Sequence, residues 1–216
     1  MPAPAAAQVG PGYSLSIASD DRFRGHSTSD KRPVATGTIS YDHASGVYAG
    51  LSLTGGPTRD EGLRVLRSVQ YLGYARHVGP GVSLEGGISH RIYSRQATVE
   101  YARTFTECYV GVTGRRVASR LFYSPNYDAY HHSATYAEVD ALLLNQGDWS
   151  VTGHLGLLAS PTYRQGDPQR VEVDWRAGVT RRLGRLSLSA TLVGGGPDYR
   201  DHRFRGTAVF ALTRSF

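Results

Sequence analysis

Residues 207–216, "TAVFALTRSF", alternate between two kinds of side chain. Ala208, Phe210 and Leu212 share one parity, which also carries Phe216, whereas the other parity is mostly small or polar. A period of two residues predicts a β-strand, because successive side chains of a strand point to opposite faces. The apolar face of this strand needs either a second protein layer or lipid against it. The rest of the chain decides between the two.

The same alternation recurs along the whole chain of 216 residues. Strands are predicted at residues 12–24, 34–43, 47–53, 65–77, 81–93, 97–113, 116–125, 133–145, 149–160, 170–182, 185–194 and 203–216. Their connections alternate between short turns rich in Gly, Asn and Asp and mostly longer, polar segments. This layout is typical of an outer-membrane barrel with short periplasmic turns and long extracellular loops. The predicted fold class is all-β: a transmembrane antiparallel up-and-down β-barrel of about 12 strands.

A soluble β-sandwich also alternates, and the composition alone does not exclude it. Hydrophobic residues make up 40% of the chain and the mean hydropathy is −0.34, but lipid-facing and lumen-facing residues cancel in such averages. The absence of a long apolar run excludes a membrane-spanning helix. The regular connections and Phe216, which suits an interfacial aromatic girdle, favour the membrane barrel. We expect residues 12–216 to form one barrel, and residues 1–11 to be a flexible stub left after a signal peptide is removed.

The charge balance and the cysteine count bear on partners and cofactors. The net charge is +6, but Lys31 is the only lysine and the arginines are scattered singly, so nucleic acid is not expected as a partner. Cys108 is alone, which excludes an internal disulfide and a cysteine-type zinc site. The histidine spacing brings no three ligands together. The glycines at 194–196 lack the lysine and helix of a phosphate loop. No metal site and no cofactor are predicted.

Charged side chains fall on the parity opposite the apolar one in most predicted strands. An arginine facing lipid at the membrane midplane would cost about 2–4 kcal/mol, so these side chains are expected to point into the lumen. The candidate lumen and selectivity residues are Glu85, Arg91, Arg103, Glu107, Arg120, Glu138, Asp140, His154, Glu172, Asp174 and Arg176. Two interpretations are open: ion pairs that stiffen the barrel, or a charged constriction that selects solutes. A barrel of this size has room for a narrow path and not for a wide pore.

The connection of the first predicted hairpin, residues 19–33, is long and polar: "SDDRFRGHSTSDKRP". It is expected on the extracellular side, where Asp20, Arg22, Phe23 and Arg24 are the residues of interest. One interpretation is that the segment folds over or into the mouth of the barrel. The other is a surface loop that binds lipopolysaccharide phosphates through Arg22 and Arg24. The sequence does not separate the two.

Residues 19–53 also carry a recognisable set of motifs. The stretch resembles the TorF-type porin family, also called Gcw_chp, of proteobacterial outer-membrane proteins. The matching residues are Ser19, Asp20, Arg22, Phe23, Arg24, Gly25, Ser27, Ser29, Pro33, Tyr48, Ala49 and Gly50. Asp21 stands where the family usually has an aromatic residue, and Val47 replaces a phenylalanine. "YARTFTECYVGV" and "FYSPNY" followed by "YAEVD" are similar to later family motifs. The resemblance implies an outer-membrane location and a channel, and names no substrate.

The sequence thus predicts passive passage of small hydrophilic solutes across the outer membrane of a Gram-negative bacterium. One rival is a lipid-modifying hydrolase: His131 and Ser133 share a face and could form a base and nucleophile, but no third group orients the histidine. The other rival is a pore-less structural or adhesion barrel. The expected partners are outer-membrane lipids, lipopolysaccharide and small hydrophilic solutes. The oligomeric state is left open, and no enzymatic activity is predicted.

Overall fold

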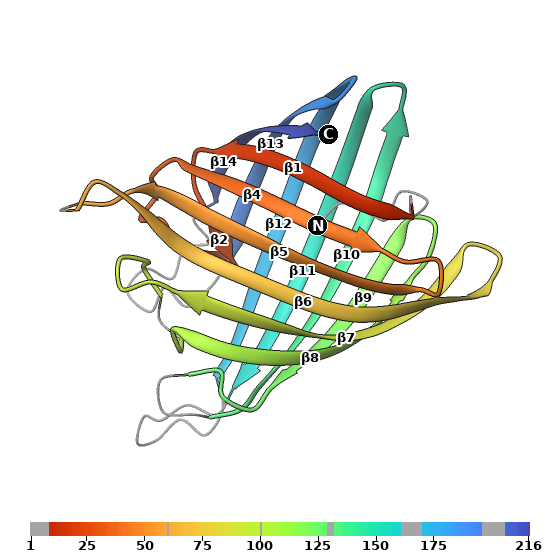
Figure 1. Ribbon diagram of the computed structural model, residues 1–216, viewed down its shortest axis with the longest axis horizontal. Helices are drawn as coiled ribbons and strands as arrows, with labels where there is room; N and C mark the ends of the chain where they lie inside the picture. Colours follow the sequence, from red (N-terminus) through yellow and green to blue (C-terminus); the bar gives the residue numbers. More distant parts are fainter. Residues whose placement is uncertain (1–8, 60, 100, 129–131, 161–169, 196–205) are drawn as a thin grey trace.

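The computed structural model describes residues 9–59, 61–99, 101–128, 132–160, 170–195 and 206–216. Twelve antiparallel strands close into one barrel, and two very short strands form a separate hairpin (Figure 1). The barrel strands are β1 (Gly10–Ala18), β4 (Val34–Asp42), β5 (Val47–Pro57), β6 (Leu63–Gly79), β7 (Val82–Tyr93), β8 (Thr104–Thr113), β9 (Val117–Ser124), β10 (Ala134–Gln146), β11 (Trp149–Ser160), β12 (Arg170–Leu183), β13 (Leu186–Gly195) and β14 (Thr207–Ser215). The small hairpin is β2 (Arg22–Phe23) and β3 (His26–Ser27).

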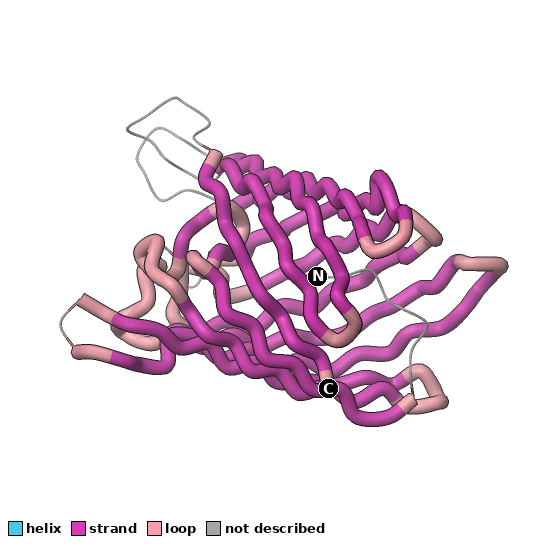
Figure 2. Tube along the Cα trace, turned by 90° about the horizontal axis from the view of Figure 1, so that it is seen from above, coloured by secondary structure: helices cyan, strands magenta, loops and turns pink. Residues whose placement is uncertain are grey.

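The barrel closes where its last strand meets its first. β14 pairs with β1, with Ile17 opposite Leu212, and every other barrel strand pairs with its neighbours along the chain. Figure 2 shows the strands wrapping around a common interior. Closure leaves no open sheet edge, so every strand has partners on both sides. The predicted fold class is confirmed. Among the described residues, no helix is long and apolar enough to cross a membrane.

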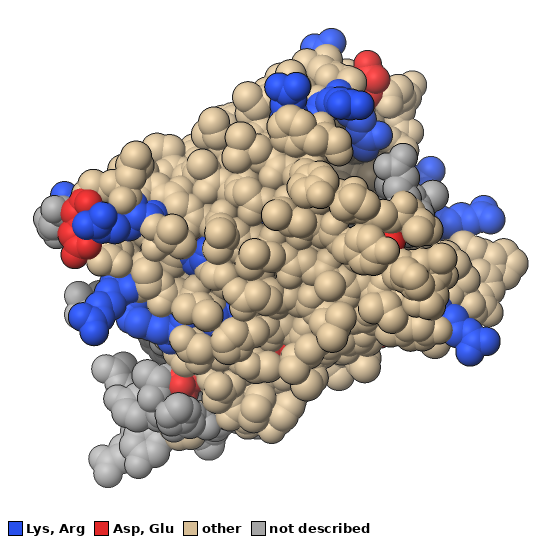
Figure 3. All heavy atoms as spheres, viewed as in Figure 1, with Lys and Arg blue, Asp and Glu red and all other residues tan. Residues whose placement is uncertain are grey.

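Apolar side chains cover the outside of the barrel. In β11, Leu155 is 63% exposed while its neighbour His154 is buried, and in β14 Phe210 and Leu212 point outward. The face of the barrel seen in the space-filling view shows few charges over its broad middle (Figure 3). An apolar belt of this kind is costly in water and favourable against hydrocarbon. The period of two in the sequence therefore separates a lipid-facing surface from a lumen.

Short turns gather at one end of the barrel and longer connections at the other (Figure 1). The short turns are residues 43–46, 80–81, 114–116, 147–148 and 184–185, and we call this the short-turn end. Gly46 and Gly184 occupy positive φ angles of 96° and 61° in two of these turns, a conformation that glycine adopts without strain. The opposite end is called the long-loop end. In outer-membrane barrels the short turns face the periplasm.

Two strand predictions were too long. The strand expected at 12–24 ends at Ala18, because the chain then turns inward and the carboxylates of Asp20 and Asp21 are satisfied by side chains of the same segment and of β6. The strand expected at 97–113 begins only at Thr104. The predicted strand 203–216 is described from residue 206 on. The expected stub at 1–11 falls mostly outside the described residues and stays a prediction.

Aromatic side chains fill the interior near the long-loop end. Phe105 has no exposed surface, and the rings of Phe23, Tyr101 and Tyr127 lie 5.3–6.1 Å from its centroid. These contacts combine strand residues with residues from the connections. They explain why the chain before β8 leaves the alternating pattern: its buried side chains, including Tyr101, pack onto this cluster. We call the group the aromatic cluster.

Candidate functional site: a polar ladder and an inward segment in the lumen

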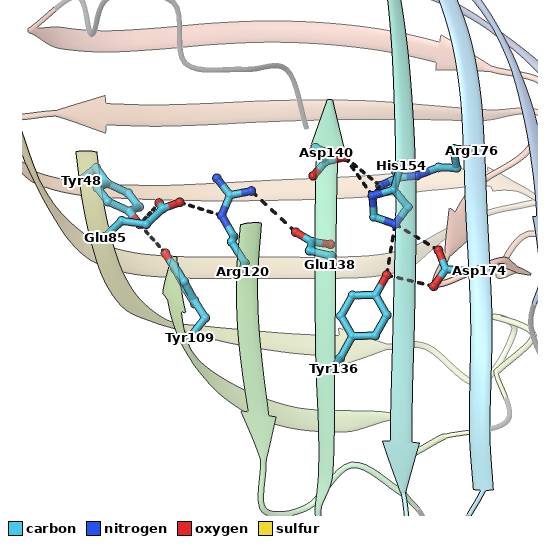
Figure 4. A network of polar contacts seen from close by, with 10 residues as sticks. All are labelled: Tyr48, Glu85, Tyr109, Arg120, Tyr136, Glu138, Asp140, His154, Asp174 and Arg176. Carbon is cyan, nitrogen blue, oxygen red and sulfur yellow. Dashed lines mark hydrogen bonds and ion pairs between the residues drawn. The ribbon is translucent and has the colours of Figure 1, made fainter. Parts of the chain in front are cut away.

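Ten polar side chains form a continuous row inside the barrel, which we call the polar ladder (Figure 4). Its members are Tyr48, Glu85, Tyr109, Arg120, Tyr136, Glu138, Asp140, His154, Asp174 and Arg176. They come from β5 and from β7 to β12. Cross-strand register brings them together: Glu138 lies opposite Arg120, and His154 lies between Asp140 and Arg176. Because directly opposite residues of a sheet point to the same face, these charges meet in the lumen.

Arg120 occupies the centre of one half of the ladder. Its Nε lies 2.8 Å from Glu85 Oε1, and its Nη1 lies 3.6 Å from Glu138 Oε1. The hydroxyl of Tyr48 donates to Glu85 Oε2 at 2.9 Å and lies 2.7 Å from the hydroxyl of Tyr109. One guanidinium therefore serves two carboxylates, so this half of the ladder carries a net negative charge.

His154 occupies the centre of the other half. Its Nε2 lies 3.2 Å from Asp174 Oδ1, and its Nδ1 lies 2.8 Å from Asp140 Oδ1 and 2.8 Å from Arg176 Nη2. A protonated Nδ1 donates to Asp140, whereas an unprotonated Nδ1 accepts from Arg176. Tyr136 donates to Asp174 Oδ2 at 2.9 Å. The histidine thus has suitable partners in either protonation state.

The ladder is graded in its access to solvent. The side chain of Asp174 is 5% exposed, whereas that of Arg176 is 37% exposed. Asp140 lies between these two limits and contacts both His154 and Arg176. Buried charges of this kind need partners, and each of these has one. Because Asp140 and Arg176 are partly exposed, water and small solutes can reach this part of the ladder.

Glycines on neighbouring strands make room for the ladder tyrosines. A Cβ at Gly156 would overlap the hydroxyl of Tyr136, and a Cβ at Gly87 would overlap the ring of Tyr109. The tyrosine rings can therefore lie flat across the adjacent strand. This arrangement positions the Tyr136 hydroxyl against Asp174.

Residues 19–33 fold into the barrel, and we call them the inward segment. Arg24 is a buried charge of this segment: its Nη2 lies 2.5 Å from Glu107 Oε1, with side chains only 5% and 1% exposed. Arg91 shares the same carboxylate at 3.3 Å. The Arg24 guanidinium also lies 3.9 Å from the ring centroid of Tyr136 and 5.3 Å from that of Tyr127. The inward segment is therefore held by an ion pair and by cation–π contacts.

Hydrogen bonds within the inward segment shape it. Asp20 accepts from Arg22, Ser27 and Ser29 at 2.6–2.9 Å. Asp21 accepts from Arg67 of β6 at 2.8 Å, which ties the segment to the barrel wall. The sequence left two interpretations open for this segment. The structure shows the first, in which the segment enters the mouth of the barrel. Arg22 and Arg24 pair with carboxylates and are not presented as surface ligands for lipopolysaccharide.

Burial changes the titration of groups outside the strands. Burial raises the pKa of Tyr127 to about 12, although the charge of Arg24 acts in the opposite direction. Burial by itself would lower the pKa of Arg24, but the charge of Glu107 and the interactions with Glu107 and Tyr127 raise that pKa above its ordinary value overall. Arg24 is therefore positively charged and Tyr127 is neutral at physiological pH. This is the combination that a cation–π contact requires.

Most predicted lumen residues do point into the lumen. Glu85, Arg91, Glu107, Arg120, Glu138, Asp140, His154, Asp174 and Arg176 belong to the polar ladder or contact the inward segment. Glu172 also lies inside, 3.4 Å from His26 of the inward segment.

Arg103 was predicted incorrectly. It is exposed and donates to the carbonyl oxygens of Ser94 and Ala97, because it precedes β8 in a bent connection where alternation no longer applies. Sequence reasoning did not select Tyr48, Tyr136 or Arg67. For the tyrosines a signal exists: each faces a glycine on the adjacent strand.

Glu138, Asp140 and His154 bring three potential metal-ligand atoms within 4.8 Å of one another. The spacing argument from sequence missed this group because its members meet across strands. Two oxygens and one nitrogen suit a borderline cation such as zinc. However, Arg120 and Arg176 already engage these carboxylates, and their charges oppose a bound cation. The group therefore fits ion pairing better than metal binding. His131 lies outside the described residues, so the His131–Ser133 pair has no described geometry.

The fold is similar to that of solved outer-membrane porins and channels. A KdgM porin shares the fold with a TM-score of 0.53 at 10% identity, covering 96% of this chain and 98% of that one. A NanC porin gives 0.58 at 8% identity, covering 94% and 98%. An outer membrane channel from Pseudomonas putida F1 gives 0.54 at 10% identity, covering 98% and 97%. The apolar belt and the shared fold place the chain in the bacterial outer membrane.

At the level of sequence, the profile of one family matches residues 3–215; its description is "Bacterial protein of unknown function (Gcw_chp)". No curated protein matches the chain.

Proposed function

The chain belongs to the Gcw_chp family of bacterial proteins, and from that premise we propose that it is a channel for passive diffusion of small hydrophilic solutes across the outer membrane. The observation that carries the proposal is the polar ladder, whose charged groups line the lumen and of which Asp140 and Arg176 are partly exposed. A barrel that served only as a scaffold could fill this space with apolar side chains, which is often the more stable way to fill an interior.

The charge of the ladder favours cations over anions. Glu85, Glu138, Asp140 and Asp174 face only Arg120 and Arg176 and the single imidazole of His154. The sum is negative whether or not the imidazole is protonated. Rings of carboxylates attract cations and repel anions at close range. One structure of a KdgM porin contains disordered oligogalacturonate, a polyanion. For the present chain we propose neutral or cationic solutes instead.

The inward segment and the aromatic cluster narrow the passage near the long-loop end. The surrounding side chains cover Phe105 completely, so its ring has no exposed surface. Transport is therefore expected to be slow and limited to small solutes while the segment is folded in. Release of the Arg24–Glu107 contact would widen this half of the lumen.

Ion conductance across a planar bilayer tests the proposal. The purified barrel should give small conductance steps, and its reversal potential in a salt gradient should show cation preference. The double variant Glu138→Gln, Asp140→Asn should weaken that preference. The double variant Asp30→Asn, Glu61→Gln is the matched control, because it also removes two negative charges, both from exposed ion pairs outside the ladder. Conductance with anion preference would refute the assignment of the ladder as the selective element.

The pore-less barrel is the second candidate, and the buried aromatic cluster favours it. It would show no conductance steps, even when the inward segment is shortened by replacing residues 22–27 with a Gly–Ser turn. A hydrolase would release labelled fatty acid from phospholipid and lose this activity in Ser133→Ala. The similar solved structures are described as porins and channels, which gives the hydrolase no support.

A further inference from the structure

Exposed arginines gather at the short-turn end of the barrel. They are Arg76, Arg115, Arg116, Arg181, Arg182, Arg185 and Arg214. Among the described residues, the carboxylate side chains at the turns and strand ends there are those of Asp42 and Asp148. On the face of the molecule shown in Figure 3, the Lys and Arg side chains lie mainly toward the ends, away from the uncharged middle. The short-turn end therefore carries a concentrated positive charge.

These arginines differ from those elsewhere in the structure. Inside the lumen, Arg24, Arg67, Arg120 and Arg176 each contact a carboxylate. At the long-loop end, exposed Arg59 and Arg64 also have acidic partners. By contrast, within the part of the chain that the structure describes, no carboxylate lies within ion-pair distance of the arginines at the short-turn end. The negative charge that balances these arginines must therefore come from outside the described part of the chain.

Three of these arginines lie at the ends of the strands that flank β13 and in the turn before it: Arg181, Arg185 and Arg214. We call them the arginine patch. Ser215 donates its backbone N–H to the carbonyl oxygen of Arg185 at 3.0 Å, and Arg214 pairs with the first residue of β13. Two of the three lie over aromatic rings: Arg181 is 5.3 Å from the Trp149 centroid and Arg214 is 4.9 Å from that of Phe216. Aromatic residues paired with arginines in this way suit the level of lipid headgroups.

A hollow on the outside of the barrel begins at this patch. Its volume is about 610 Å³, and its lining includes Trp149, Arg181, Leu188, Phe210, Leu212 and Ile17. The lining runs from β11 across β12, β13 and β14 to β1. Apart from Arg181, the named side chains are apolar, and they belong to the lipid-facing surface. The hollow thus combines a positive charge at one end with an apolar path into the membrane.

We propose that this place is a binding site for an anionic phospholipid. Arg181, Arg185 and Arg214 bind the headgroup phosphates, and an acyl chain lies in the hollow. Guanidinium groups recognise phosphate oxygens in a bidentate manner, and an apolar groove beside them accepts a hydrocarbon chain. Because the short turns face the periplasm, the lipid belongs to the inner leaflet. This inference does not depend on whether the barrel conducts solutes.

Tryptophan fluorescence can test the site, because the chain has only two tryptophans. Trp149 lies at the arginine patch, whereas Trp175 lies on β12 toward the long-loop end, opposite Leu155. The variant Trp175→Phe leaves Trp149 as the reporter, and Trp149→Phe leaves Trp175 as the control reporter. Each is reconstituted in vesicles with brominated phosphatidylglycerol competing against phosphatidylcholine of the same acyl chains, and then with the two labels exchanged.

At Trp149, phosphatidylglycerol should be preferred by about fivefold or more, because each arginine near an anionic surface contributes about that factor. At Trp175 the two lipids should quench alike. The triple variant R181Q, R185Q, R214Q should bring the preference at Trp149 close to unity. The double variant R59Q, R64Q at the long-loop end should leave the preference intact.

Heat-modifiable gel migration checks that each variant is a folded barrel. Equal quenching by both lipids at Trp149 in the folded parent would overturn the proposal. So would a preference that survives the triple variant, because headgroup binding would then not depend on the patch. A preference of the same size at Trp175 would indicate a general attraction of the basic protein for anionic membranes, and would also overturn it.

Discussion

Glu107 holds the inward segment in the lumen, and Glu107→Gln should release it. The carboxylate is 1% exposed and lies between two guanidiniums, with Arg24 at 2.5 Å and Arg91 at 3.3 Å. The variant keeps the size and part of the hydrogen bonding of the side chain. It removes the negative charge, so the two buried arginines lose their common counter-ion.

The expected magnitude follows from burial. Removing one partner from a buried ion pair costs about 3–5 kcal/mol, because the remaining charge is left without compensation. The cation–π contacts of Arg24 with Tyr136 and Tyr127 stay in place, so they do not change the difference between variant and parent. Each 1.4 kcal/mol is a factor of ten, so release of the inward segment should become about two to four orders of magnitude more favourable.

Arg24→Met should have a smaller effect than Glu107→Gln. It removes the same contact, but Glu107 keeps its ion pair with Arg91 and no buried charge is left alone. A larger effect of Glu107→Gln than of Arg24→Met would therefore show that the uncompensated buried charge, and not merely the loss of one contact, releases the segment.

Limited trypsin digestion of the reconstituted barrel measures release directly in the parent and in Glu107→Gln. Arg24→Met removes the cleavage site at position 24, so the two variants are compared by cleavage after Arg22, a site that both keep. Cleavage after Arg24 requires the segment to leave the lumen, and mass spectrometry distinguishes it from cleavage at exposed Lys31. When opening is fast relative to cleavage, the cleavage rate follows the population of the open form. The rate of cleavage after Arg24 should be at least a hundredfold higher in Glu107→Gln than in the parent, because losing the buried partner costs at least about 3 kcal/mol. Single-channel conductance should also increase. Asp30→Asn, on the same segment but in an exposed pair with Arg59, should leave both unchanged. If Glu107→Gln is cleaved no faster than Asp30→Asn, the ion pair does not hold the segment.

Three further predictions follow from the packing. Gly156→Val should lower the urea midpoint of unfolding, because a side chain there overlaps the Tyr136 hydroxyl, whereas a valine at exposed Gly37 of β4, where a Cβ meets no atom within 4 Å, should leave the midpoint nearly unchanged. Leu155→Arg should destabilise folding into lipid vesicles by about 2–4 kcal/mol, since it places a charge on the lipid-facing belt; no change in folding free energy would contradict the lipid-facing assignment. Burial raises the pKa of Tyr127 to about 12, so this side chain should ionise only near pH 12. In an absorbance titration of the tyrosinate band, Tyr127→Phe should therefore lack the component that the parent shows near pH 12. Loss of a component near pH 10 would instead show that the ring is exposed.

The sequence by itself determined the membrane barrel. The alternation in "TAVFALTRSF" and its counterparts depends only on the period of two that any strand imposes, so it assigns Phe210 and Leu155 to the lipid and His154 to the lumen without knowledge of neighbours. The number of strands and the two kinds of connection are likewise local features. Family motifs in residues 19–53 pointed to the same class of protein.

The tertiary structure alone decided which charges meet. Arg24 and Glu107 are 83 positions apart, and their contact exists only because the inward segment enters a closed barrel. His154 meets Asp140 and Asp174 through the register of three strands, which strand pairing sets and a single strand cannot encode. Arg103 shows the converse: the alternation of β8 was extended to a residue before the strand, where the chain bends toward the aromatic cluster and parity no longer assigns a face. Periodicity assigns a face to each residue, whereas partners depend on closure, register and the packing of connections inside the barrel.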